Sequence, residues 1–590
     1  MEQAAQDVKN GTVRQQRRGG VLVLVLDHPP ANALTLELVA DLSQALDAAA
    51  QEPGVTSVML IGAGRGFSAG MDPSVFGAPP GAAALAALAR RIEGFAKPVV
   101  AVLHGACLGA GLELALACHW RLAAASAQFG LPEVHLGLSP GSGGSQRLPR
   151  LIGGAAALRM LLDGVPVPAD EALALGLVDQ IATGEIFQAG LEFAGSRPGP
   201  RATADRMGPS DLYGPKGALV AARARIAGQH LPAPQRIIDI VEASGLLPFD
   251  QGLVVEATTF AELAASAAAQ GLRASWEAER RAVQVPAVVA AAAPPKMEVL
   301  GLWQPAEAGI ATLLRALHAG MAVIVTALDR EGLVAVLNQV AAQQDQAVAA
   351  GDLTEVARDA EWARLSASLG PSALAAADVI LADPVEGVPG HLCLPLGGLA
   401  AGQSGPALAL HGSFAEIALG AAADPGRAAR ALALARRLGL RSLFTGPGGP
   451  MLTRLTRAQA EAALVLEAEG TAPDLIEAAL GAWRGGGAMP HGGAAILRAC
   501  QAALAVEGAR MIEDGTARRP CDVDAAAILS GLVPRWDGGP MAWADRLGLL
   551  VLRADLWARA ETEPTLYTSP PLFDRLIGEG RRLASLNTRR

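Results

Sequence analysis

The sequence predicts an α/β amino-terminal domain, a second α/β domain and an all-helical carboxyl-terminal region along 590 residues. In the first part of the chain, short apolar runs alternate with helix-like stretches, and this alternation is typical of α/β proteins. A strand–helix–strand pattern returns after a proline-rich break, and strand signals fade beyond about residue 446. A chain of this length is expected to form about four domains of roughly 150 residues each.

The elements follow from local patterns. In the first region we expect a strand over 20–27, a helix over 36–50, strands over 55–61 and 98–104, and a helix from about residue 112. After Pro294 and Pro295 we expect a strand over 297–301, a helix over 306–319 and a strand over 321–328. The predicted domains are 1–195, a helical linker region 196–295, a second α/β domain 296–446 and helical domains 447–590.

Composition excludes several function classes. The net charge is −9 and no long basic run occurs, so we expect no nucleic-acid partner. The five cysteines show no C-x-x-C spacing, which predicts neither a disulfide framework nor a metal site. The amino terminus lacks an apolar signal segment, and charges interrupt every long apolar stretch. We therefore expect a cytoplasmic protein without a membrane partner.

Three glycine-rich motifs carry the chemistry of the first region. They read GRGFSAGMD (64–72), HGACLGAGLELALAC (104–118) and AQFGLPEVHLGLSPGSGGSQ (128–147). In the second motif a Gly-Ala-Gly turn enters an apolar helix, whose first N–H groups lack intrahelical partners and attract an oxyanion. A second amide near Met71 that faced the same point would complete an oxyanion hole for a thioester enolate.

Two carboxylates accompany these amides. Glu113 lies one turn into the helix, and Glu133 follows Pro132 at a turn between apolar segments. Hydration of an α,β-unsaturated thioester removes a proton from water and delivers another to Cα. Two carboxylates that share one small site can hold a single proton between them, so their titrations would be coupled.

Together the three motifs resemble the enoyl-CoA hydratase/isomerase (crotonase) family over roughly residues 20–195, which implies a spiral crotonase fold. The roles that the resemblance implies are backbone oxyanion donors at Met71 and Ala110, water activation by Glu113, proton exchange with Cα by Glu133, and water positioning by the Gly141 amide. The family usually has glycine where this chain has Ala110, but only the backbone is required there. The presence of both acids favours a hydratase over a pure double-bond isomerase.

The resemblance also implies a place for coenzyme A. Residues 30–34 match the family's strand-to-helix turn, whose backbone lies along the CoA moiety, and Asp72 matches the acid that closes the adenine-side loop. The implied CoA-binding residues are Ala31, Ala33, Leu34, Ala69 and Asp72.

The second half resembles the 3-hydroxyacyl-CoA dehydrogenase part of multifunctional fatty-acid oxidation enzymes. The closest matches are AVEGARMIEDGTA (505–517) and the helical segment 520–548. This resemblance implies a Rossmann-like domain followed by all-helical domains.

The nucleotide motif of that family is degenerate. A dinucleotide site needs G-x-G-x-x-G after the first strand, where this chain has GLWQPAE from Gly301 to Glu307. Trp303 fills the space of the second glycine, Pro305 removes an amide, and Glu307 places negative charge where a diphosphate would lie. Asp329, after the second strand, could meet a ribose or cap a helix. We expect no NAD binding.

The dehydrogenase residues are degenerate as well. His411 lacks the aromatic-Pro run that follows the family's catalytic histidine, and Glu416 matches its partner only if several residues are deleted. The family's serine and asparagine positions carry no polar group here. The degenerate dehydrogenase site then comprises Gly301, Trp303, Asp329, His411 and Glu416.

The predicted activity is the reversible addition of water to a 2-enoyl-CoA, and the same two acids could also isomerise a double bond. The predicted partner is an acyl-CoA thioester, with no further cofactor, and the predicted state is a monomer. Three alternatives stay open: a bifunctional hydratase and NAD-dependent dehydrogenase, a non-catalytic acyl-CoA-binding protein, and a crotonase-type hydrolase of an unusual CoA thioester.

Overall fold

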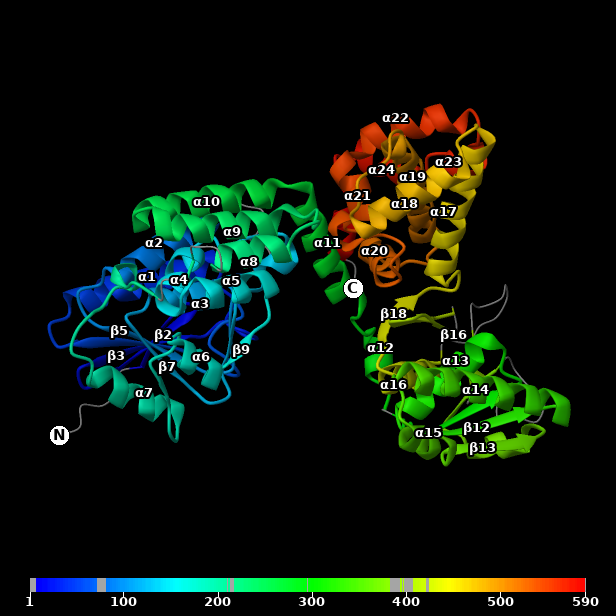
Figure 1. Cartoon of the computed structure of the whole chain (residues 1–590), viewed down its shortest axis with the longest axis horizontal. Coiled ribbons are helices and arrows are strands. Elements are labelled where there is room, and N and C mark those ends of the chain that lie inside the picture. The colour runs from blue at the N-terminus through cyan, green and yellow to red at the C-terminus, as the bar shows by residue number, and fades with distance from the viewer. Residues whose placement is uncertain are drawn as a thin grey trace. The chain divides into compact units, whose positions relative to one another are not determined.

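A computed structural model describes most of the chain. The described residues are 7–71, 81–208, 211–212, 217–293, 295–382, 393–394, 396, 407–420 and 424–588. The chain divides into two compact units, and the boundary between them falls after Leu272 (Figure 1). Most of the segment 196–295 therefore belongs to the first unit.

A seven-stranded sheet forms the centre of the first unit, in the order β1-β2-β3-β4-β5-β7-β10. Its strands are β1 (Asp7–Asn10), β2 (Val13–Arg18), β3 (Val21–Leu26), β4 (Ser57–Gly62), β5 (Val99–Leu103), β7 (Trp120–Ala123) and β10 (Gln180–Ile181). From β3 onward neighbouring strands are parallel. Every residue of β3, β4 and β5 is buried, because apolar cores cover both faces of the sheet.

Helices α1 (Leu36–Gln51) and α2 (Gly81–Glu93) contribute to the core on one face, and α7 (Ile186–Gly195) packs on β4 and β5 at the other. Thr35 caps α1 by accepting a hydrogen bond from the Leu38 N–H at 3.1 Å. The polar capping residue followed by an apolar stripe explains why the helix begins where the sequence predicts it.

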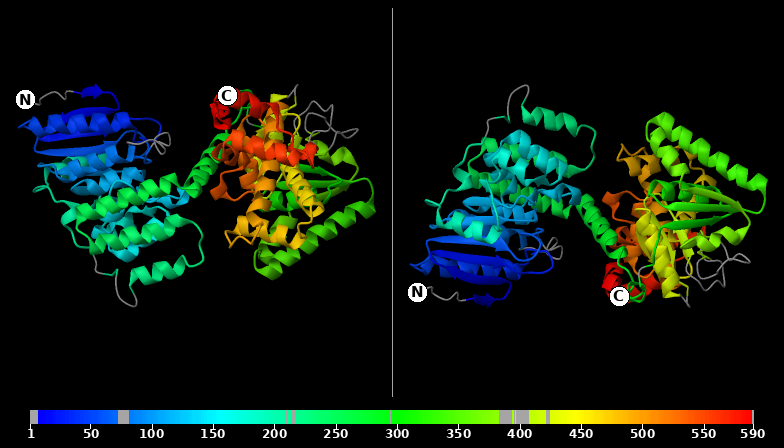
Figure 2. Two further views of the ribbon diagram at one scale, coloured as in Figure 1. Left: turned by 90° about the horizontal axis from the view of Figure 1, so that it is seen from above. Right: turned by 90° about the horizontal axis from the view of Figure 1, so that it is seen from below.

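A smaller second sheet carries the motif region. It consists of β6 (Ala106–Leu108), β8 (Gln128–Gly130) and β9 (Val167–Pro168). The helices around it are α3 (Ala110–Ala117), the 3-10 helices η2 (Pro132–Leu136) and η3 (Thr203–Asp205), α4 (Gly144–Ile152), α5 (Gly154–Asp163), α6 (Ala169–Leu175), α8 (Ala218–Arg225), α9 (Pro232–Leu246) and α10 (Phe249–Ala265). Helices α9 and α10 lie side by side and both pack on α4 (Figure 1, Figure 2).

In the second unit a parallel sheet has the order β13-β12-β11-β14-β15. Its elements are β11 (Val299–Trp303), α13 (Glu307–His318), β12 (Ala322–Ala327), α14 (Arg330–Ala350), α15 (Glu355–Trp362), β13 (Leu365–Leu369), β14 (Val379–Leu381) and β15 (Cys393–Leu394). The first strand is central, as in one half of a doubly wound sheet.

A three-stranded sheet, β16 (Ala407–Leu410), β17 (Phe414–Ala418) and β18 (Arg441–Thr445), packs against α16 (Pro425–Arg437). The described residues after β18 form helices only, as the fading strand signals predict. These helices are α17 (Met451–Ala468), α18 (Pro473–Gly485), α19 (Gly493–Glu513), α20 (Pro520–Leu529), α21 (Pro540–Leu547), α22 (Leu549–Ala560), α23 (Pro564–Tyr567) and α24 (Pro571–Gly578).

Helices α11 (Ala267–Ala282) and α12 (Ala287–Ala290) precede β11 in the sequence. No single helix in the described ranges has the length and apolar character of a membrane span, although the bent pair α10 and α11 does when taken together.

Candidate functional site

The amide pair predicted for the oxyanion hole lies where the 68–71 segment passes the start of α3. Gly109 precedes the helix with a φ of 52°, a conformation that favours glycine. A Cβ on Gly70 would lie 3.5 Å from the Ala110 nitrogen, so residues 70 and 110 are immediate neighbours. Within the described residues, neither the Met71 N–H nor the Ala110 N–H has an acceptor. Two unpaired donors on adjacent backbone segments can hold one oxyanion.

Glu113, in the first turn of α3, is almost fully buried. Its Oε1 accepts hydrogen bonds from the Ser142 N–H at 2.7 Å and from the Gly144 N–H at 2.9 Å. Burial, with the negative charge of Glu256, raises the pKa of Glu113 to about 7. The side chain can therefore change its protonation state near neutral pH, which suits a general base.

Glu133 lies in the first turn of η2, after Pro132. A Cβ on Gly109 would lie 3.0 Å from the Glu133 Oε1, so this carboxylate reaches the start of α3. Its Oε2 is buried and has no hydrogen-bond partner in the described part of the chain. Burial, followed by repulsion from Glu113, raises the pKa of Glu133 well above its ordinary value. The structure thus brings both predicted acids to the same helix start as the two amides.

A third acid lies at this site that the sequence did not predict. Glu256, on α10, is 1% exposed and accepts hydrogen bonds from the Gly143 N–H, from the Ser145 N–H at 2.8 Å and from the Ser145 hydroxyl. Burial raises its pKa as well. In the sequence, Glu256 is one of three acids in a mostly apolar helical stretch, with Asp250 and Glu262, and nothing in the pattern distinguishes it from the other two.

Gly141, the predicted water-positioning residue, lies directly beneath α10. A Cβ at this position would come within 2.8 Å of the Phe260 ring, so only glycine fits. Its N–H donates no hydrogen bond to any described acceptor. This amide is thus available to a water molecule beside the acids.

The segments predicted to hold coenzyme A run side by side. The Ala69 N–H donates to the Ala31 carbonyl at 3.0 Å, and the Leu34 N–H donates to the Gly70 carbonyl at 2.8 Å. Ala31 and Ala69 are exposed, Ala33 is half-buried and Leu34 is buried. Asp72 lies outside the described residues. These two hydrogen bonds hold the predicted CoA-binding segments next to the backbone that carries the Met71 amide.

In the second unit, His411 and Glu416 form a pair despite the shortened spacing. The His411 Nε2 lies 3.1 Å from the Glu416 Oε1. Glu416 also accepts hydrogen bonds from the Met451 N–H at 2.6 Å and the Leu452 N–H at 3.0 Å, at the start of α17. The carboxylate thus caps a helix and contacts the histidine at once.

The residues after β11 do not fit a dinucleotide. Trp303 ends the strand, Pro305 offers no N–H, and Glu307 occupies the first turn of α13. A cavity of about 580 Å³ beside this helix start is lined by Glu307, glutamines, Pro305 and aliphatic side chains, with no cationic group to meet a diphosphate. Asp329 caps α14 by accepting from the Gly332 N–H at 2.8 Å, so its carboxylate is already engaged. Gly301 packs against Leu374, Ala377 and Ile380.

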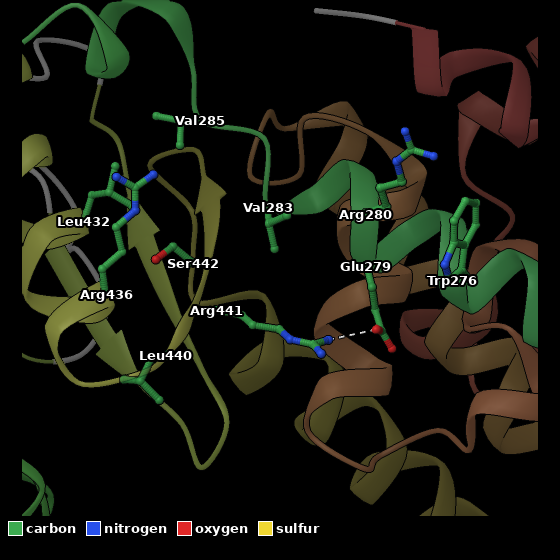
Figure 3. Close-up of a pocket in the computed structure, with 10 residues that line it drawn as sticks. All are labelled: Trp276, Glu279, Arg280, Val283, Val285, Leu432, Arg436, Leu440, Arg441 and Ser442. Carbon is green, nitrogen blue, oxygen red and sulfur yellow. Dashed lines mark hydrogen bonds and ion pairs between the residues drawn. The ribbon is translucent and has the colours of Figure 1, made fainter. Parts of the chain in front are cut away.

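Another cavity of the second unit, of about 600 Å³, lies between the end of α11, α16 and β18 (Figure 3). Glu279 points across it and pairs with Arg441 at 2.8 Å. None of the predicted site residues lines this cavity.

Comparison with known proteins finds similarity over the region that carries the motifs. Residues 16–190 match the sequence model of the enoyl-CoA hydratase/isomerase family. The chain is 48% identical over 165 residues to a probable enoyl-CoA hydratase of Bacillus subtilis, covering 27% of this chain and 64% of that protein. It is 38% identical over 269 residues to the peroxisomal bifunctional enzyme of Danio rerio, and the match covers 44% of this chain and 37% of that protein.

A peroxisomal fatty acid beta-oxidation multifunctional protein of Arabidopsis thaliana is 32% identical over 369 residues, which cover 59% of this chain and 50% of that protein. The chain therefore spans less than two thirds of the length of each of these relatives. The expected likeness to multifunctional fatty-acid oxidation proteins is confirmed. The likeness to the enoyl-CoA hydratase/isomerase family thus spans residues 16–190, the part of the chain that carries the three glycine-rich motifs.

Proposed function

We propose that the first domain catalyses the reversible addition of water to a 2-enoyl-CoA thioester. The observation that carries this proposal is the meeting of the buried Glu113 and of Glu133, whose Oε2 is buried, with two unpaired amides at and beside the start of α3. A binding protein has no need of buried acids with raised pKa values, because such groups cost stability.

The proposed mechanism uses the backbone to stabilise charge and the acids to move protons. The thioester oxygen accepts hydrogen bonds from the Met71 and Ala110 N–H groups, which stabilise the enolate. Ionised Glu113 removes a proton from water while the water oxygen bonds to Cβ. The electrons of the double bond move toward the thioester, and protonated Glu133 gives its proton to Cα. Proton exchange with solvent then resets both acids.

The raised pKa values agree with these roles. A pKa of about 7 leaves a useful fraction of Glu113 ionised at neutral pH, and burial, which raises the pKa of Glu133 well above its ordinary value, favours the protonated form of that acid. Two acids whose environments differ in this way can act as base and acid in one step. Coenzyme A enters as part of the substrate, and the step needs no other cofactor.

A direct assay tests the proposal. Purified protein should lower the ultraviolet absorbance of the conjugated thioester in a short 2-enoyl-CoA until equilibrium is reached, and Glu113→Gln should remove most of this activity. Release of free CoA thiol at the same rate would instead favour a thioester hydrolase. Binding of the thioester without loss of absorbance would favour a non-catalytic acyl-CoA-binding protein.

We also propose that the second unit is a Rossmann-like scaffold without dehydrogenase activity. The misfit of Trp303, Pro305 and Glu307 supports this proposal. The His411–Glu416 pair favours the second candidate, a bifunctional hydratase and dehydrogenase, because a histidine held by a carboxylate suits proton transfer from a hydroxyl group.

Nicotinamide binding separates these two candidates. Titration of NADH into the protein should leave the fluorescence of the nicotinamide unchanged, because a diphosphate would meet Glu307 and no amide at Pro305. Addition of an enoyl-CoA to the same sample, followed by the hydration assay, controls for folded protein. Saturable binding of NADH in the micromolar range would establish the bifunctional candidate.

A further inference from the structure

We infer that Glu256 is a positioning residue for hydration, which acts from α10 through the turn of residues 142–145 at the start of α4. This inference rests on the proposed function of the same site. Glu256 lies opposite Glu113 across this turn, and the two carboxylates accept hydrogen bonds from the same stretch of backbone.

The four successive N–H groups of the turn alternate between the two carboxylates. Those of Ser142 and Gly144 face Glu113, at 2.7 and 2.9 Å. Those of Gly143 and Ser145 face Glu256, and the Ser145 hydroxyl adds a third hydrogen bond. The N–H groups at a helix start otherwise lack partners, so these two acids together fix the direction of each peptide. Movement of one acid would rotate the peptides that hold the other.

Helix α10 also restrains Gly141, the residue that precedes this turn. Phe260 follows Glu256 by four residues, so both side chains lie on one face of the helix. The Phe260 ring lies against Gly141, whose amide is the predicted water-positioning group. A single helix face thus holds the turn from residue 141 to residue 145. Glu256 thereby sets where Glu113 and the water amide lie relative to each other.

The charges around Glu256 come from three further elements. Glu113 on α3 and Glu133 on η2 repel it, and Arg147 on α4 attracts it. Arg147 is itself held by Glu93 at 2.8 Å and donates to the Ser142 carbonyl at 2.9 Å. Because Glu256 raises the pKa of Glu113, removal of its charge should let Glu113 ionise at lower pH.

Glu256→Gln tests the inference, because it keeps the size of the side chain but replaces one accepting oxygen with a donor. We expect kcat for hydration to fall about 10-fold or more, with KM changed less than about 2-fold and the acid limb of the kcat profile shifted to lower pH. Glu256→Asp keeps the charge, so kcat should fall without the pH shift. Glu262→Gln, on the exposed surface of the same helix, is the matched control and should behave as the unaltered protein.

A second readout separates this inference from the proposed function. Carbon-13 NMR can follow ionisation of the Glu113 carboxyl, assigned by its loss in Glu113→Gln, whether or not the protein hydrates an enoyl-CoA. Ionisation at lower pH in Glu256→Gln supports the inference even if hydration is absent. Unchanged kcat, pH profile and Glu113 titration in a folded Glu256→Gln protein would overturn it and leave Glu256 as a helix cap alone.

Discussion

Glu133→Gln is expected to lower kcat for hydration by about 10²–10⁴-fold, the usual contribution of a positioned general acid. The amide keeps the shape of the side chain but has no proton to give to Cα. The oxyanion donors and the CoA surface are untouched, so KM should change little. Steady-state hydration of a short enoyl-CoA measures both values, and a kcat near that of the unaltered protein would remove Glu133 from the reaction.

The same substitution should stabilise the fold at alkaline pH. The ordinary pKa of a glutamate, 4.5, holds in the unfolded chain, and the folded pKa of Glu133 is well above it. Between these values the folded state binds more protons than the unfolded state, so the free energy of unfolding falls as pH rises. Glu133→Gln removes the contribution of this carboxyl group to the fall in the free energy of unfolding. Its Tm should therefore exceed that of the unaltered protein at pH 8 and match it at about pH 4, with each kcal/mol worth about 2–4 °C.

Calorimetry at both pH values checks this expectation. A lower Tm for Glu133→Gln at pH 8 would show that the buried oxygen without a partner does not destabilise the fold. Glu262→Gln again serves as the control, because its exposed carboxylate should contribute little at either pH.

Ala110→Pro is expected to lower kcat by about 10²–10³-fold, since it deletes one of the two oxyanion donors. Ala110 is the first residue of α3, where proline is well tolerated because its missing N–H has no intrahelical partner. The helix, and with it Glu113, should remain in place. Hydration kinetics and circular dichroism together measure the effect.

Ala110→Gly is the matched control for this prediction. It keeps the N–H and restores the residue that the family usually carries, so kcat should stay within about 3-fold of the unaltered value, a change of under 1 kcal/mol. Equal activity of the proline and glycine variants would mean that this amide does not hold the thioester oxygen.

The sequence was sufficient to predict the elements that carry the motifs, because periodicity and glycine turns are local properties. The predicted strand over 98–104 and the helix that carries Glu113 lie within a few residues of β5 and α3, whereas the short strand β6 between them was not predicted. Glu256 could not be predicted in the same way. It lies 111 residues from Ser145, and only the packing of α10 on α4 brings them together.

In the second unit, local patterns revealed the residues that oppose dinucleotide binding, but they did not reveal which side chains contact each other. Glu307 begins the helix close to where the pattern predicts it, but β11 runs two residues beyond its predicted end, so that Trp303 ends the strand and does not lie in the turn after it. The His411–Glu416 contact depends on the tight antiparallel pairing of β16 with β17, which returns the chain within a few residues. A comparison of spacings alone could not reveal that a shorter connection preserves the pair.

The packing of α10 on α4 also determines which shortened forms of the chain would keep the site intact. A shortened chain that stops at residue 195 would keep both reacting acids and both oxyanion amides, yet the Gly143 and Ser145 N–H groups would face solvent in place of Glu256. The stretch that matches the family model ends at residue 190 and therefore excludes Glu256, which lies in the compact unit that extends to Leu272. A division of the chain keeps Glu256 beside these N–H groups only if it falls after α10, and the boundary of the first compact unit, after Leu272, meets this condition.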